Sequence, residues 1–149
     1  MKRIFTFAVL WFAFSLVINA EKSWAQYERY SAQNALLTLR PKAVFMGNSI
    51  TNNWAKFHPE FFAENNFLGR GISGQTTAQM LSRFQSDVVA LRPKMVIIMA
   101  GTNDIAMNNG YISHEHILQN IQSMCELAKH HKIKPVLCSC LPAAAFKWR

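Results

Sequence analysis

Cysteine is scarce in this sequence of 149 residues, which has only Cys125, Cys138 and Cys140. Three cysteines are too few for a disulfide scaffold. Cys138 and Cys140 lie two apart on a predicted strand, where their side chains face the same side. A disulfide between them is permitted only in an oxidising compartment, and buried thiols are the simpler expectation. No spacing of cysteine and histidine suits zinc, so we expect neither a metal nor a cofactor.

Acidic residues are also few, with 8 against 16 lysines and arginines and a formal net charge of +8 at pH 7. This excess does not indicate a nucleic-acid partner, because the basic residues are scattered and no run of them is interleaved with aromatic side chains. One cluster, Lys129-His130-His131-Lys132, falls where a helix is expected to end. Cations there complement the helix dipole. We therefore expect no nucleic-acid binding.

One long hydrophobic run is present, from Ile4 to Ile18, with two basic residues before it. Small residues that suit a signal peptidase follow, so cleavage is expected after Ala20 or Ala25. The run is short for a transmembrane helix, which needs about 20 residues, although an uncleaved anchor stays open as an alternative. No cysteine lies near either cleavage site, which argues against a lipoprotein. The sequence thus predicts a signal peptide over residues 1–25. The mature protein would be exported to the periplasm or outside the cell, without a stable membrane anchor.

After the signal peptide, apolar and polar segments alternate in the order β-α-β-α-β-α-β. This order is typical of an α/β fold in which a doubly wound parallel sheet lies between two layers of helices. The third strand is apolar without alternation, which predicts a strand covered on both faces. No linker divides the chain, so one domain is expected over residues 26–149, with a loop at 101–109. The expected strands are 43–46, 67–72, 94–100 and 134–141, and the expected helices are 27–39, 53–65, 77–91 and 114–129.

Small and amide residues follow three successive strands of this predicted sheet. Ser49 comes just after the first strand, Gly74 after the second and Asn103 after the third. Loops at the carboxyl ends of parallel strands line the crevice where ligands bind. Taken with its own stretch alone, Ser49 is more simply a helix N-cap than a nucleophile. Together, the three loops supply a hydroxyl and three donors for a developing oxyanion. The donors are the backbone N–H groups of Ser49 and Gly74 and the side-chain amide of Asn103.

These three loops resemble blocks I, II and III of the SGNH/GDSL hydrolase superfamily, in the same order and with similar separations. The match covers residues 43 to about 141, and three such segments on strand ends form a specific pattern. Within the superfamily, the sequence is similar to secreted bacterial GDSL-type esterases and acylhydrolases related to the subunits of platelet-activating-factor acetylhydrolase. The three segments are Gly47-Asn48-Ser49-Ile50-Thr51, Gly71-Ile72-Ser73-Gly74-Gln75-Thr76-Thr77 and Gly101-Thr102-Asn103-Asp104.

The resemblance implies a flavodoxin-like three-layer fold and a serine esterase. Ser49 is the implied nucleophile, and Ser49, Gly74 and Asn103 form the implied oxyanion hole, with Asn48 and Asp104 supporting the loops. An acyl group would pass from a small ester to Ser49 and then to water. We expect acetyl esters of carbohydrates as substrates, with lipid or lysophospholipid esters as the alternative. A non-catalytic module that retains the pocket for ligand binding is the alternative from a different class.

The sequence departs from the pattern of the family in two places. Asn48 stands where the family usually has aspartate, which keeps the size of the side chain and removes one negative charge. The general base and acid of the family come from a late Asp-x-x-His motif. This motif is absent here, together with the fifth strand that precedes it. We therefore expect a domain that is incomplete at its C-terminus. The chain as given should be inactive or nearly so, because a serine hydroxyl without a base is a poor nucleophile.

None of the five histidines is expected to replace the missing base. His58 suits the start of a helix. His114 and His116 open a later helix on the side of the sheet that carries the three loops, where solvated histidines are more common than catalytic ones. His130 and His131 belong to the far end of that helix.

Two other families with a loop after a strand fit less well. The serine turn of α/β-hydrolases has the form Gly-x-Ser-x-Gly, and Thr51 stands in the last position here. A phosphate-binding P-loop needs a lysine and a longer spacing, and residues 47–51 have neither.

Overall fold

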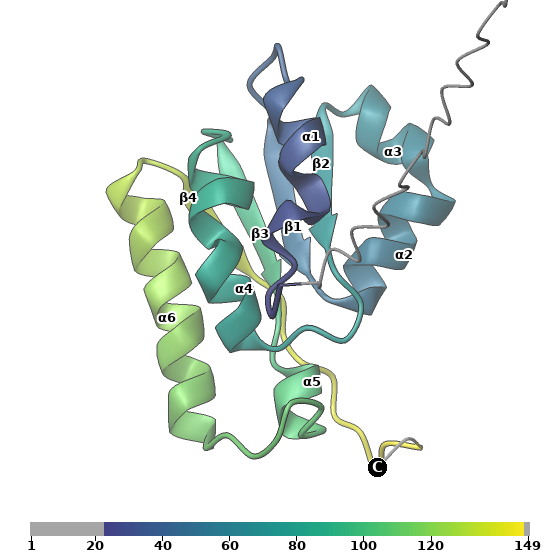
Figure 1. The fold of residues 1–149 in the computed structure, drawn as a ribbon, viewed down its shortest axis with the longest axis vertical. Coiled ribbons are helices and arrows are strands. Elements are labelled where there is room, and N and C mark those ends of the chain that lie inside the picture. Colours follow the sequence, from purple (N-terminus) through teal and green to yellow (C-terminus); the bar gives the residue numbers. More distant parts are fainter. Residues whose placement is uncertain (1–22, 148–149) are drawn as a thin grey trace, which may run out of the picture.

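The computed structural model describes residues 23–147. The predicted hydrophobic run and the cleavage position at Ala20 lie outside these residues, as does Trp148. Four parallel strands form one sheet in the order β2-β1-β3-β4 (Figure 1). They are β1 (Ala43–Gly47), β2 (Phe67–Gly71), β3 (Met95–Met99) and β4 (Lys134–Leu137). The predicted α/β class and parallel sheet are therefore confirmed.

Helices lie on both faces of the sheet (Figure 1). One face carries α4 (Thr77–Phe84), its π-helical extension η2 (Gln85–Val89) and α6 (His114–His130). The opposite face carries α2 (Ser49–Phe57) and α3 (Pro59–Glu64). The chain leads in through η1 (Tyr27–Tyr30) and α1 (Ser31–Ala35), and a short helix, α5 (Thr102–Ile105), follows β3. The helices α2, α4 and α5 follow β1, β2 and β3 respectively. Because these strands are parallel, the three predicted loops meet at one edge of the sheet.

Each face of the sheet packs a core of its own. The larger core joins Val44 and Met46 of β1 to side chains of α4 and α6. The smaller core is aromatic and centres on Phe45, whose ring lies 5.3 Å from that of Phe62 and 5.4 Å from that of Trp54. All five residues of β1 are buried, since it is the strand enclosed from both faces. Burial of these apolar side chains is the main favourable term that holds the layers together.

Two predictions about apolar residues need correction. β3 is fully covered on one face and only partly on the other: Val96 and Ile98 are buried, whereas Met95, Ile97 and Met99 are half-buried. The reason is that α2 and α3 pack over β1 and β2, so the second face of β3 is left partly open among the described residues. The cysteine thiols were expected to be buried, but Cys125 and Cys138 are half-buried and Cys140 is exposed, and all three are free.

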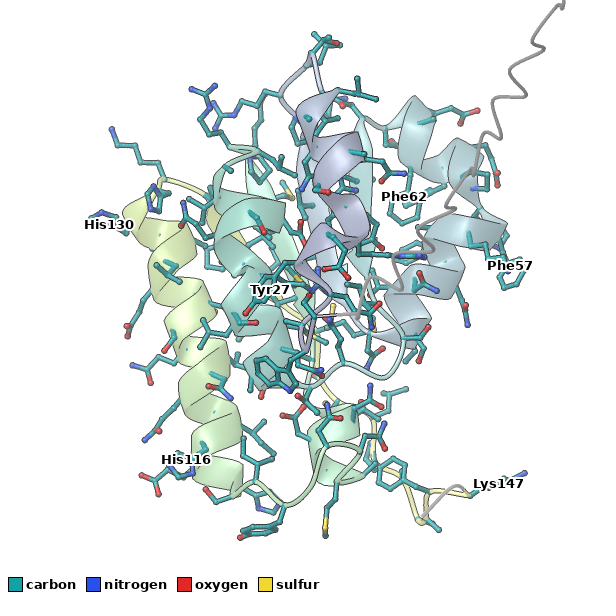
Figure 2. All side chains as sticks on the ribbon, in the orientation of Figure 1. Tyr27, Phe57, Phe62, His116, His130 and Lys147 are labelled. Atoms are coloured by element: carbon teal, nitrogen blue, oxygen red, sulfur yellow. The ribbon has the colours of Figure 1, made fainter. Side chains whose placement is uncertain are left out.

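Several predicted element boundaries also differ. The helix predicted at 27–39 ends at Ala35. The segment predicted as one helix at 53–65 forms two, because Pro59 opens α3, where the absence of its N–H costs nothing. Phe57, the last residue of α2, is 65% exposed and points away from the sheet (Figure 2). The predicted loop at 101–109 contains α5. Within residues 23–147 no helix has both the length and the apolar character that a membrane crossing requires.

Candidate active site

The three predicted loops line one pocket at the carboxyl ends of the strands. Its volume is about 400 Å³. Ser49, Gly74 and Asn103 all contribute to its wall, so the structure brings the three predicted site residues together although they are far apart in the sequence. The lining residues are Asn48, Ser49, Ile50, Gly74, Thr102, Asn103 and Asn108.

Asn48, and not Ser49, caps the helix that starts the pocket. The Asn48 side chain is 2% exposed, and its Oδ1 accepts a hydrogen bond from the Ile50 N–H at 3.1 Å. Ser49 is the first residue of α2, so the interpretation of Ser49 as an N-cap is wrong. Its backbone N–H belongs to the first turn, where donors have no partner within the helix and the helix dipole is positive. Both features favour a negative oxygen at this position.

Gly74 is required here by backbone conformation. Its φ is +82°, which residues other than glycine rarely adopt. A Cβ added at Gly74 would meet no atom within 4 Å among the described residues, so crowding by the protein is not the reason for glycine. The turn is closed by a hydrogen bond from the Gln75 N–H to the Ile72 carbonyl at 3.3 Å.

The side chain of Asn103 is held on both of its polar atoms. Its Nδ2 donates to the Gln75 carbonyl at 2.9 Å, and its Oδ1 accepts from Asn108 Nδ2 at 2.9 Å. A carboxamide nitrogen carries two N–H groups. One is engaged by Gln75, and the other has no protein partner within residues 23–147. Asn103 is 6% exposed, which keeps this donor in a setting of low dielectric.

Asp104 connects α5 to the start of α4. Its carboxylate accepts the Thr77 N–H on both oxygens at 3.0 Å and the Thr77 hydroxyl at 2.6 Å, and the side chain is 1% exposed. Burial raises the pKa of Asp104, and the hydrogen bonds from Thr77 oppose this rise without cancelling it. Asp104 therefore ties the loop of Asn103 to the start of α4.

The raised pKa of Asp104 predicts how the stability of the fold depends on pH. A carboxyl group with a higher pKa in the folded state binds its proton more tightly there, so the free energy of unfolding falls as pH rises from about 4 through the folded-state pKa. In Asp104→Asn this part of the slope should disappear. Urea unfolding over a pH series measures it, with Glu115→Gln as the control for loss of one exposed carboxylate. An unchanged slope in Asp104→Asn would contradict the prediction.

A buried arginine on α4 was missed by sequence reasoning. Arg83 of α4 has no exposed surface, and its Nη1 lies 2.8 Å from Asp87 Oδ2. Its Nε donates to Gln75 Oε1 at 2.6 Å and its Nη2 to the Arg70 carbonyl at 2.8 Å. The pKa of Arg83 is lowered by burial, and the carboxylate of Asp87 opposes this change without cancelling it. The spacing of Arg83 and Asp87 by four residues, within an apolar helix face, was the available signal.

Among the described residues no histidine lines this pocket. His58 is exposed, with its Nδ1 3.3 Å from Glu60. His114 lines a separate apolar pocket that also contains Cys140. His116 and His130 lie at opposite ends of α6 (Figure 2), as the sequence predicted for the two histidine pairs.

The fold is that of the SGNH/GDSL class of hydrolases. The sequence model of the GDSL-like lipase/acylhydrolase family matches residues 45–149, and the chain belongs to this family.

Three relatives illustrate the relationship. A GDSL-like lipase of Bacteroides thetaiotaomicron has 52% identity and a TM-score of 0.81, over 85% of this chain and 64% of its own. The uncharacterized lipoprotein YqeF of Bacillus subtilis is 40% identical over 78 residues, which are 50% of this chain and 32% of that protein. An acetylxylan esterase of Geobacillus stearothermophilus has 20% identity and a TM-score of 0.53, over 68% of this chain and 61% of its own, which shows the fold alone. This chain thus spans less than two thirds of the length of each of these relatives.

Proposed function

We propose that this chain carries the nucleophile and oxyanion hole of an exported serine esterase. One observation supports this most: Ser49, Gly74 and Asn103 line a single pocket of about 400 Å³. The Ser49 hydroxyl would attack the ester carbonyl carbon, and the N–H groups of Ser49 and Gly74 and the amide of Asn103 would stabilise the oxyanion. The alcohol leaves with a proton, and water then releases the acyl group from Ser49. Membership of the family agrees with the esterase, and a relative named as a lipoprotein agrees with export.

The proposed substrate is a short acyl ester, an acetyl group on a carbohydrate. Three asparagines, Ser49 and Thr102 line the pocket, and their amides and hydroxyls suit the hydroxyl groups of a sugar. Among the described lining residues, Ile50 is the one large apolar side chain. The alternative is a lipid ester, and a neighbouring hollow of about 310 Å³ favours it. That hollow lies beside α5 and is lined mainly by apolar side chains, among them Ile105, Ile117 and Ile121.

We also propose that residues 1–149 alone hydrolyse esters slowly. The sequence contains no Asp-x-x-His motif, and no described histidine lines the pocket. The hydroxyl of Ser49 then has no general base to accept its proton. A preformed oxyanion hole still lowers the barrier when a triad is incomplete, which predicts slow rather than absent turnover.

The test uses p-nitrophenyl acetate, with free imidazole supplied as a base. In buffer alone, we expect hydrolysis by the unchanged chain to exceed that of Ser49→Ala by less than about tenfold. Added imidazole should enlarge the difference, because it can accept the Ser49 proton, whereas its own background reaction is the same in both proteins. Ser82→Ala, a serine on α4 bonded to the Gln79 carbonyl, is the matched control and should behave like the unchanged chain.

Two outcomes would contradict parts of this proposal. Fast Ser49-dependent turnover in buffer alone would show that a base is present. No Ser49-dependent rate even with imidazole would favour a non-catalytic binding module. Replacing the substrate by p-nitrophenyl octanoate distinguishes the two substrate classes, since the lipid alternative predicts a higher kcat/KM for the longer ester.

A further inference from the structure

The main chain of residues 23–25 is hydrogen-bonded to the loop that carries Gly74 and to α4. The Ala25 carbonyl accepts a hydrogen bond from Gln75 Nε2 at 2.7 Å, and the Trp24 carbonyl accepts one from Gln79 Nε2 at 2.7 Å. Ala25 has no exposed surface. Ser23 closes a turn beneath them, with its carbonyl accepting from the Gln26 N–H at 2.9 Å. We call residues 23–25 the N-terminal strap.

The two glutamines that hold the strap use their oxygens elsewhere. Gln75 is 2% exposed, and its Oε1 accepts from Arg83 while its backbone carbonyl holds Asn103. Gln79 is 7% exposed, and its Oε1 accepts from the Thr76 N–H at 3.1 Å. Only the strap carbonyls accept from the two Nε2 groups within the described residues. Without the strap, two buried donors would lose their partners, and such unpaired donors destabilise a fold strongly.

We propose that signal peptidase cleaves after Ala20 and that the strap remains in the mature protein. This inference rests on the export proposed above. The sequence allows cleavage after Ala20 or Ala25, and the contacts of the strap distinguish the two. Cleavage adds water across the Ala20–Glu21 peptide bond, leaving a carboxylate on Ala20 and a free amino group on Glu21. Cleavage after Ala25 would instead remove both acceptor carbonyls with the leader.

The retained strap also positions the pocket. Gln75 follows Gly74 directly, and its carbonyl fixes the amide of Asn103. By holding the Gln75 side chain, the strap fixes the loop that carries the Gly74 N–H and that orients the Asn103 amide. These are two of the three proposed oxyanion donors. Loss of the strap should therefore loosen the site as well as the fold.

The first experiment maps the N-terminus of the full chain after export from a bacterial host, by intact mass and N-terminal sequencing. We expect the released protein to begin at Glu21, and Ala20→Leu, which changes no described residue, to abolish release. A mature protein that begins at Gln26 would overturn the inference while leaving export intact. A chain that keeps Met1 would overturn it too, and recovery of that uncleaved chain from the cytoplasm would contradict export itself. Continued release from Ala20→Leu would also count against the assigned bond.

The second experiment tests the strap contacts in the exported protein. Gln75→Glu and Gln79→Glu together keep each oxygen acceptor and remove each donor to the strap. Amide hydrogen exchange at residues 24–27 and 73–76 should become at least about tenfold faster, with α6 unchanged as the check on folding. Gln119→Glu, an exposed glutamine bonded to Glu115, is the matched control. Unchanged exchange at both segments in the double variant would overturn the role of the strap, and the N-terminal map remains decisive if that variant fails to fold.

Discussion

Arg83→Met should lower the free energy of unfolding by about 3–5 kcal/mol, because it leaves the buried carboxylate of Asp87 without its cation. The two side chains are 0% and 1% exposed, and Nη1 of Arg83 lies 2.8 Å from Oδ2 of Asp87. The substitution would also leave the Arg70 carbonyl at the end of β2 and the Gln75 side chain without a donor. The end of β2 and the Gly74 loop should therefore loosen together.

Equilibrium urea unfolding measures this effect. Two further variants separate the loss of the buried ion pair from the loss of an arginine alone. Arg29→Met removes an arginine that is exposed, and it should change the free energy of unfolding by less than about 0.5 kcal/mol. In Arg83→Met/Asp87→Leu, both charges are replaced by apolar groups, which should recover part of the loss. A loss in Arg83→Met as small as that in Arg29→Met would show that the buried ion pair does not stabilise the fold.

Gly71→Ala should lower the free energy of unfolding by about 3 kcal/mol or more, at the upper end of what overpacking usually costs. A Cβ at Gly71 would lie 2.3 Å from the backbone nitrogen of Asn52 and 2.7 Å from the Asn48 carbonyl oxygen. These are main-chain atoms of the turn that carries Ser49, and they cannot rotate away as the end of a side chain can. The first turn of α2 would have to move off β2, and Ser49 with it.

Gly110→Ala provides the contrast for this prediction. Gly110 has a φ of +91° and nothing within 4 Å of an added Cβ, so its substitution introduces backbone strain without a clash, worth about 1–2 kcal/mol. Thermal or urea unfolding of the two variants compares the stability lost to a steric clash with the stability lost to backbone strain. A smaller loss for Gly71→Ala than for Gly110→Ala would contradict the backbone-to-backbone packing of α2 on β2.

Much of the fold was predictable because its signals are local. The apolar runs around β1 and β3 and the turn after each strand identified the parallel sheet, which the structure confirms. Serine is a preferred N-cap residue, and Ser113 caps α6 with its Oγ accepting the His116 N–H at 3.2 Å. The boundaries that failed, such as the end of α1 at Ala35, depend on tertiary contacts of a short helix that its own sequence does not stabilise.

The pocket itself was predictable only in part. Ser49, Gly74 and Asn103 were placed together because parallel strands end at one edge of a sheet, and all three line the same pocket. Their roles in catalysis remain proposals that the Ser49→Ala comparison tests. Asn48 as the cap of α2 was not foreseen, since either asparagine or serine satisfies a helix N-terminus and only the observed geometry selects between them.

The sequence by itself therefore determined the class of fold, the order of its strands along the chain and the residues that gather at one edge. Only the tertiary structure decided that Arg83 is buried, that one face of β3 stays half open and that the strap carbonyls of Trp24 and Ala25 hold Gln79 and Gln75. The physical reason is sequence separation. Periodicity and turn chemistry act between neighbours along the chain. A hydrogen bond between residues fifty positions apart leaves no local pattern and forms only when packing brings its partners together.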